Sequence, residues 1–178
     1  MADQAFLDIE TLYQRYRLPI FRSVSGVVFD AAAAEDLTQE TFEKAWRARL
    51  SYRGGPDEVA WWLYRIAMNE ALSWLKRQRW GRRLALGTAA ATESGHEGAG
   101  RPAGGEPADL ALSVLSPKLR AVVVLTYLAD LTPQEVAAAL DIPRGTVATH
   151  LTRAKRLMRE ALTAAQPARL PGDEAANA

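Results

Sequence analysis

Hydroxyl and guanidinium side chains gather in the segment 131–162, on one face of a helix that is predicted to begin near Arg144. Such groups can bond to base edges and phosphates, and a helix that carries them fits the major groove of duplex DNA. The polar face of this helix comprises Arg144, Thr146, Thr149, Thr152, Arg153, Lys155 and Arg156. The pattern favours DNA binding over its alternative, an ordinary helical hairpin with a solvated basic face.

The residues around this face predict a helix-turn-helix. Thr132 and Pro133 have the types preferred at an N-cap and at the first helical position. Asp141 stands where the chain must turn sharply, and Asp tolerates that backbone conformation better than most residues. The apolar residues of the two helices recur at helical spacing: Val136, Ala137 and Leu140 in the first, and Val147, Leu151, Ala154 and Met158 in the second.

Composition limits the chemistry that the chain can perform. The 178 residues include no cysteine and two histidines, His96 and His150, so we expect no metal site and no cofactor. Neither a nucleophile–base pair nor a glycine-rich phosphate loop is evident, which argues against an enzyme acting on nucleic acid. No apolar run is long enough to span a bilayer, and the amino-terminal segment is charged, so we expect a cytoplasmic protein without membrane insertion.

The net charge of +1 conceals an uneven distribution. Acidic residues dominate the first forty positions, whereas the segment 65–83 and the last predicted helix are basic. This asymmetry indicates separate surfaces for protein and for DNA.

Hydrophobic periodicity predicts an all-α fold of two small helical domains joined by a flexible linker. Helices are expected near 6–16, 20–28, 32–49 and 59–80, with Trp46 on the buried side of the third. We place the first domain at 1–84, the linker at 85–109, the helix-turn-helix domain at 110–163 and a disordered tail at 164–178. The linker and tail are assigned from their Gly, Ala and Pro content, which leaves little to bury.

Two stretches of the chain resemble a known family. AAEDLTQETFEKAW (33–46), SYRGG (51–55) and WWLYRIAMNEALSWLKRQR (61–79) resemble region two of bacterial sigma factors of the extracytoplasmic-function (ECF) group. LSPKLRAVVVLTYLADLTPQEVAAALDIPRGTVATHLTRAK (115–155) resembles their region four. The resemblance covers nearly all of the chain outside the linker and tail. It implies an RNA polymerase subunit that directs promoter recognition, DNA melting and transcription initiation.

The resemblance implies a docking face for core RNA polymerase. The residues matching the helix that contacts the clamp helices of the polymerase largest subunit are Asp36, Leu37, Gln39, Glu40 and Phe42. Asp36, Gln39, Glu40 and Glu43 also recur at helical spacing, which gives an acidic, amide-bearing stripe. Without the family pattern, a solvated helix face would be the simpler interpretation.

The resemblance also implies that the protein recognises the minus-ten promoter element as an opened single strand. An extruded base would be surrounded by Tyr52, Tyr64 and Asn69. Binding to a single strand requires aromatic faces for stacking, polar groups for base edges and cations for phosphates, and this segment has all three. The complete predicted set is Tyr52, Arg53, Trp61, Tyr64, Arg65, Asn69, Lys76, Arg77 and Arg79. Packing is expected instead for Trp62, Ile66 and Leu72. Ser73 replaces the Asp that is common in the family, so details of this recognition are expected to differ.

The helix-turn-helix would read the duplex minus-thirty-five element and contact the polymerase flap. The predicted contacts are Arg144, Thr146, Ala148, Thr149, Thr152, Arg153 and Lys155. Ala148, Thr149 and His150 stand where family members often carry Lys-Ser-Arg, so the base preference should differ from that of a typical member. Many members are controlled by an anti-sigma factor, which makes such a protein a candidate partner.

The alternative to this interpretation is a LuxR-type transcription regulator, because GTVATHL (145–151) also resembles the recognition helix of that group. Such a regulator would bind duplex operators tightly by itself. The helical, aromatic and basic first domain argues against it, because that domain lacks an α/β receiver pattern.

Overall fold

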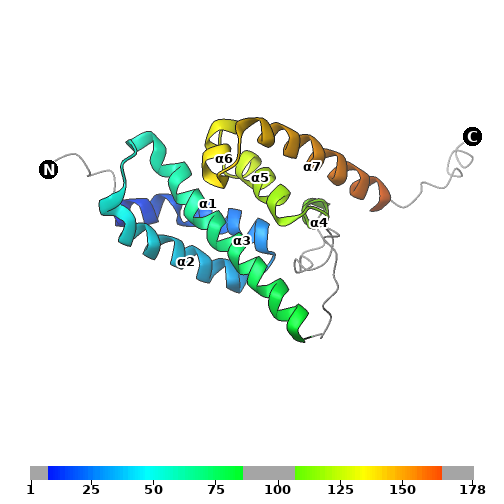
Figure 1. Cartoon of the computed structure of the whole chain (residues 1–178), viewed down its shortest axis with the longest axis horizontal. Helices are drawn as coiled ribbons and strands as arrows, with labels where there is room; N and C mark the ends of the chain where they lie inside the picture. Colours follow the sequence, from blue (N-terminus) through cyan, green and yellow to red (C-terminus); the bar gives the residue numbers. More distant parts are fainter. Residues whose placement is uncertain (1–7, 86–106, 166–178) are drawn as a thin grey trace, which may run out of the picture.

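The computed structural model describes residues 8–85 and 107–165, and this part of the chain is helical without strands, as the sequence predicts (Figure 1). The α-helices are α1 (Ile9–Val28), α2 (Ala31–Ala48), α3 (Val59–Ala85), α4 (Pro107–Ser113), α5 (Pro117–Tyr127), α6 (Pro133–Leu140) and α7 (Arg144–Ala165). Two 3₁₀ turns, η2 (Arg49–Ser51) and η3 (Pro56–Glu58), connect α2 to α3. Residues 86–106 of the predicted linker and 166–178 of the predicted tail lie outside the described residues.

The first helix corrects a sequence-based expectation. The sequence predicts separate helices at 6–16 and 20–28, but α1 is continuous and contains Pro19. Proline removes one helical hydrogen bond and usually interrupts a helix. Here Leu12, before Pro19, and Ile20, after it, are buried in one core, and this shared burial holds both halves in line.

The second helix is held by its N-cap and by one apolar face. The Asp30 carboxylate accepts a hydrogen bond from the Ala33 N–H at 2.9 Å, which satisfies a free donor of the first turn. The predicted buried face is present: Ala34, Leu37, Thr41, Phe42 and Ala45. The expectation for Trp46 is wrong, because its side chain is 48% exposed and the Arg49 guanidinium lies 3.3 Å from its ring centroid.

The third helix is the long element that crosses Figure 1. Its inner residues recur at every fourth position, which is the spacing of one helix face: Val59, Leu63, Ala67, Ala71 and Leu75. Glu70 forms an ion pair with Lys44 at 2.5 Å and so ties α3 to α2. The helix continues to Ala85, five residues beyond the predicted end.

The helix-turn-helix is present as the sequence predicts. Thr132 and Glu135 form a reciprocal capping box at the start of α6, with Pro133 in the first turn. Asp141 ends α6 with a φ of 52°, in the left-handed region expected for this turn. Val136 and Val147 are buried in the same core cluster, whereas Ala154 is buried in a second cluster with Leu115, Leu119 and Val123. The supporting helix α4 begins at Pro107, so the last three residues assigned to the linker are helical.

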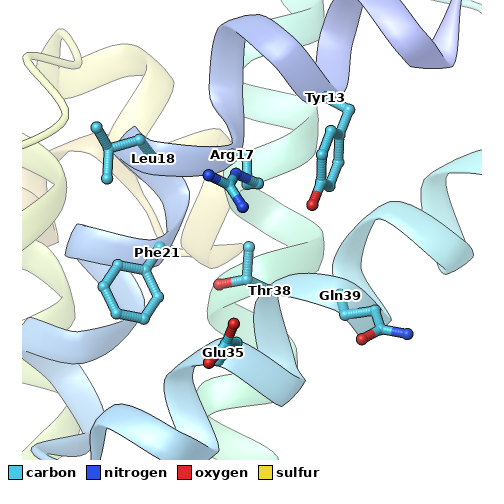
Figure 2. Close-up of a pocket in the computed structure, with 7 residues that line it drawn as sticks. All are labelled: Tyr13, Arg17, Leu18, Phe21, Glu35, Thr38 and Gln39. Carbon is cyan, nitrogen blue, oxygen red and sulfur yellow. The ribbon is translucent and has the colours of Figure 1, made fainter.

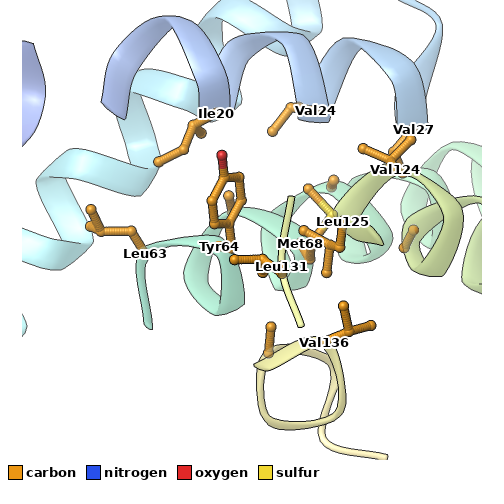
Figure 3. Close-up of a cluster of buried hydrophobic side chains, with 14 of the residues drawn as sticks. Ile20, Val24, Val27, Leu63, Tyr64, Met68, Val124, Leu125, Leu131 and Val136 are labelled. Carbon is orange, nitrogen blue, oxygen red and sulfur yellow. The ribbon is translucent and has the colours of Figure 1, made fainter. Parts of the chain in front are cut away.

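The two helical units share one hydrophobic core (Figure 3). Residues of α1, α3, α5 and α6 meet at this core, with α6 packed on α3 and α5 packed on α1. The residues labelled in the close-up are Ile20, Val24, Val27, Leu63, Tyr64, Met68, Val124, Leu125, Leu131 and Val136. The units are therefore in direct contact in this structure.

Candidate nucleic-acid and protein-docking surfaces

The predicted duplex-reading face of α7 is open to solvent. Arg144, Ala148, Thr149, Thr152, Arg153 and Lys155 are exposed, and Thr146 is half-buried. A shallow depression of about 510 Å³ runs along this face and is lined by Ala148, Thr149, Thr152, Arg153 and Arg156. The structure thus brings four of the seven predicted contacts together with Arg156, which the sequence placed on the polar face but not among the contacts.

The threonine hydroxyls on α7 are oriented by their own helix. The Thr149 hydroxyl donates to the Gly145 carbonyl at 3.2 Å, and the Thr152 hydroxyl donates to the Ala148 carbonyl at 3.0 Å. With their protons used in this way, both oxygens retain lone pairs that can accept from base amino groups. Lys155 is directed elsewhere, since its ammonium lies 5.8 Å from the Tyr127 ring centroid on α5.

Tyr52, predicted to face an extruded base, is folded into its own loop. Its side chain is 7% exposed, its hydroxyl donates to the Gly55 carbonyl at 2.8 Å, and its ring centroid lies 4.8 Å from that of Trp62. Burial, aided by the negative charge of Glu58, raises the pKa of Tyr52 to about 12. A Cβ at Gly54 would lie 2.5 Å from the Tyr52 hydroxyl, so glycine is needed for this close approach.

Tyr64 belongs to the inner face of α3. It is 3% exposed, and Figure 3 shows its ring beside Ile20 within the shared core. Burial raises the pKa of its phenol. Of the proposed base pocket, only Asn69 lies on the exposed side of the helix. The structure therefore does not bring Tyr52, Tyr64 and Asn69 together as one open pocket.

Of the remaining predicted minus-ten residues on α3, Arg65 and Asn69 are exposed, whereas Trp61 is half-buried and packs against the core. Trp61, Arg65 and Asn69 follow one another at four-residue spacing and so share a helix face. Lys76 and Arg77 extend the exposed cations toward the end of α3, and Arg79 is half-buried. Arg53 in the preceding loop is exposed, and its guanidinium donates to the Leu50 and Tyr52 carbonyls. The residues expected to pack, Trp62, Ile66 and Leu72, do lie against the core.

The predicted protein-docking face on α2 divides into two sets of residues. Asp36, Gln39 and Glu40 are exposed, whereas Leu37 and Phe42 are 2% and 5% exposed and belong to the core. The Phe42 ring packs edge-on against Tyr13, with centroids 5.0 Å apart. Leu37 and Phe42 therefore fix the helix, and the three polar residues form the accessible stripe.

A cavity of about 270 Å³ lies beside this stripe, between α1 and α2 (Figure 2). It is lined by Tyr13, Arg17, Leu18, Phe21, Glu35, Thr38 and Gln39. Gln39 belongs to both the cavity and the stripe. Sequence reasoning missed this cavity because it depends on how α1 and α2 are placed side by side.

Two family models match the chain in the order of its two helical units. Sigma-70 region 2 matches residues 12–81, from α1 through most of α3, and Sigma-70, region 4 matches residues 106–158, from α4 into α7. The ECF RNA polymerase sigma-E factor of Salmonella typhimurium (strain 14028s) is 34% identical in an alignment of 158 residues that covers 81% of each chain. The chain belongs to the ECF family of RNA polymerase sigma factors.

Solved structures share the fold of this sigma factor. Sigma factor RpoE of Bartonella quintana, in complex with the anti-sigma factor NepR, matches with a TM-score of 0.70 and 22% identity over 89% of this chain and 99% of that one. CnrH, in complex with the cytosolic domain of CnrY, matches with a TM-score of 0.68 and 23% identity over 93% and 100% of the two chains.

The region 2 match decides between the two interpretations of the helix-turn-helix. A sigma factor and a LuxR-type regulator share a recognition helix, so α7 alone does not separate them. Residues 12–81 form the unit in which the two classes differ, and they match the sigma family. Within the described ranges, this sigma factor has no helix that combines the length and apolarity needed to cross a bilayer.

Proposed function

We propose that this sigma factor docks on the clamp helices of the polymerase largest subunit through the exposed stripe of Asp36, Gln39 and Glu40. All three side chains lie on one face of α2 and are accessible. Carboxylates and an amide complement basic partner side chains, and such complementarity governs both encounter and specificity. Leu37 and Phe42 contribute by holding α2 in place.

The two DNA surfaces divide promoter recognition. The strip of Trp61, Arg65 and Asn69 on α3 would meet the opened minus-ten strand, because it combines an aromatic face, a cation and an amide. The depression on α7 would meet the minus-thirty-five duplex, with the region 4 unit leaning on the polymerase flap. Two modest contacts joined through polymerase gain affinity by effective concentration.

Tyr52 and Tyr64 take supporting roles in this proposal. Each ring is buried and holds an exposed neighbour in place: Tyr52 orders the loop that carries Arg53, and Tyr64 anchors the helix turn before Asn69. The base-extrusion role predicted for them would require the loop and the helix face to rearrange on DNA.

The phosphoryl-transfer chemistry belongs to the polymerase in this proposal, and the sigma factor, acting in the cytoplasm, selects where synthesis begins. An anti-sigma factor is also proposed as a partner. This is supported by the similar structure of sigma factor RpoE of Bartonella quintana, which was solved in complex with the anti-sigma factor NepR.

The observation that carries the proposal is that regions 2 and 4 occur in one chain, each with an exposed polar face. Run-off transcription with core polymerase across genomic fragments tests it. The sigma factor should convert nonspecific synthesis into initiation at a small set of start sites, while binding duplex DNA weakly when polymerase is absent. Initiation that is no more selective with the protein than without it would refute the proposal.

A further inference from the structure

The end of α3 exposes two large apolar side chains that neither proposed DNA surface includes. Trp80 is 64% exposed, and Leu84, about one turn later, is 68% exposed. Neither belongs to a core cluster of the described residues. Figure 1 shows the last turns of α3 extending past α1 and α2, and a Cβ at Gly81 would meet no other atom within 4 Å. The indole of Trp80 therefore presents an open face to solvent.

Trp80 lies on the same face of α3 as Asn69. The two residues are eleven positions apart, which is about three turns of an α-helix, so their side chains leave the helix within about 20° of each other. Lys76 is exposed on this face between them, and Arg65 is exposed one turn before Asn69. The face proposed to meet the opened minus-ten strand thus continues to the end of α3, where Trp80 is its aromatic residue.

The aromatic residues predicted from the family pattern offer little open surface for stacking. Tyr52 and Tyr64 are 7% and 3% exposed, and Trp61 is half-buried against the core. Among the aromatic side chains of the described residues, Trp80 is the most exposed. The next tryptophan in exposure, Trp46, is covered on one side by a guanidinium. Because binding to a single strand depends on open aromatic faces, Trp80 is the side chain best placed to supply one.

The charge around Trp80 favours DNA as the partner of this surface. Residues 71–85 contain no Asp or Glu and five cations: Lys76, Arg77, Arg79, Arg82 and Arg83. Cations beside an aromatic face are typical of surfaces that follow a phosphate backbone. A lipid surface would attract the same charges, but a helix that binds lipid buries a continuous apolar face, and the exposed large apolar residues of α3 are Trp80 and Leu84 alone within its described part.

We propose that Trp80 stacks on a base of the opened promoter strand, about five nucleotides from the base that meets Asn69. The two residues lie about 16 Å apart along α3, and stacked nucleotides advance by about 3.4 Å each. Lys76 and Arg77 contact the phosphates between the two bases. The inference rests on the proposed function of α3, and it adds the residue that sets the length of strand bound.

Binding of the holoenzyme to a promoter opened in advance by a mismatched bubble tests the stacking. Trp80→Ala should weaken this binding by about tenfold, because stacking on one base accounts for an affinity of this size. Trp80→Tyr keeps an aromatic face and should restore most of the loss. Trp46→Ala is the matched control, since it removes an exposed indole from α2 and should leave bubble binding unchanged. Binding to core polymerase should be the same for all of these proteins.

A scan of abasic sites along the opened strand locates the contact. The natural holoenzyme should lose affinity at one abasic position to which Trp80→Ala is insensitive, because a missing base cannot stack. A second position should become silent in Asn69→Ala, and the two should lie about five nucleotides apart. The proposal is wrong if the two positions coincide, or if Trp80→Ala responds to every abasic site as the natural chain does.

Failure of the stacking and failure of the sigma function give different results. If core polymerase binds the bubble equally well with and without the natural chain, the proposed function is wrong. If Asn69→Ala weakens bubble binding and Trp80→Ala does not, only the role of Trp80 is refuted. Equal losses of bubble binding and core binding in Trp80→Ala would assign the indole to polymerase instead. Reduced binding to phosphatidylglycerol vesicles with unchanged bubble binding would assign it to a lipid surface, and either result overturns the proposal.

Discussion

The two units of this sigma factor present their polar residues differently. In the region 4 unit, six of the seven predicted DNA contacts on α7 are exposed on one helix. In the region 2 unit, α2 presents an acidic stripe, while α3 presents cations and an amide outward and turns Tyr64 inward. Region 4 is therefore a single reading surface, whereas region 2 combines a protein-docking face and a DNA face on neighbouring helices.

This difference shows where a motif can be interpreted residue by residue. The contacts of a helix-turn-helix all lie on the outer face of one helix, so spacing alone separates them from the core. The minus-ten set spans a loop and a helix that also builds the core, so membership in a motif does not establish exposure. Separate substitutions on α2, α3 and α7 should therefore affect different steps of initiation.

The largest effect is expected on the docking face of α2. Asp36→Ala combined with Glu40→Ala should weaken binding to core polymerase by about a hundredfold, because both charges face the proposed partner. Fluorescence anisotropy with labelled sigma factor measures this affinity. Glu10→Ala combined with Glu160→Ala, which removes two exposed acids from α1 and α7, should change it little. Equal affinities for the two double variants would place the docking face elsewhere.

A second substitution separates the two faces of region 2. Asn69→Ala should lower the rate of promoter opening by about tenfold, because one lost base contact costs on the order of 1–3 kcal/mol. Binding to core polymerase should be unchanged. Permanganate footprinting of the minus-ten region measures opening. Gln78→Ala is the control, since this exposed amide lies on the opposite face of α3. Equal loss of opening and core binding would contradict the assignment of Asn69.

A smaller effect is expected in region 4. Arg153→Ala should weaken binding of the holoenzyme to the minus-thirty-five element by about fivefold. If Arg153 contacts a phosphate, the slope of log affinity against log salt should also fall by about one. Arg159→Ala, an exposed arginine outside the depression, should leave both quantities unchanged. An affinity loss that depends on base sequence, with an unchanged slope, would instead assign Arg153 to a base edge.

The sequence predicts this fold closely where local signals agree. Thr132, Pro133 and Asp141 mark the helix-turn-helix, and the structure confirms each of these positions. Pro19 shows the limit of local signals, because burial on both sides of it keeps α1 continuous. Trp46 shows another limit, since its contact with Arg49 depends on how the chain leaves α2.

The shared core between the units could not be predicted from periodicity. An apolar helix face shows that a residue is buried but does not identify its partner. The Arg120 guanidinium of α5 donates to the Val27 carbonyl of α1, 93 positions away, although Arg120 lies in an apolar helix where a cation has no evident role. Gly26 carries no sequence signal either, because the space beside it is limited by the side chain of Val124.

The smallest effect concerns Tyr52, whose buried hydroxyl distinguishes a structural role from direct contact with DNA. Tyr52→Phe removes the hydrogen bond to the Gly55 carbonyl and should lower the free energy of unfolding by about 1 kcal/mol.

The Tyr52 pKa near 12 also makes the free energy of unfolding depend on pH. The folded protein keeps the phenol protonated after the unfolded chain has lost that proton at its ordinary pKa near 10, so stability should fall as pH rises from about 10 to 12. Chemical denaturation across this range should show a shallower decline for Tyr52→Phe than for the natural chain. Identical declines would mean that Tyr52 titrates as an accessible side chain, and that its ring is free to stack on a base without rearrangement of the loop.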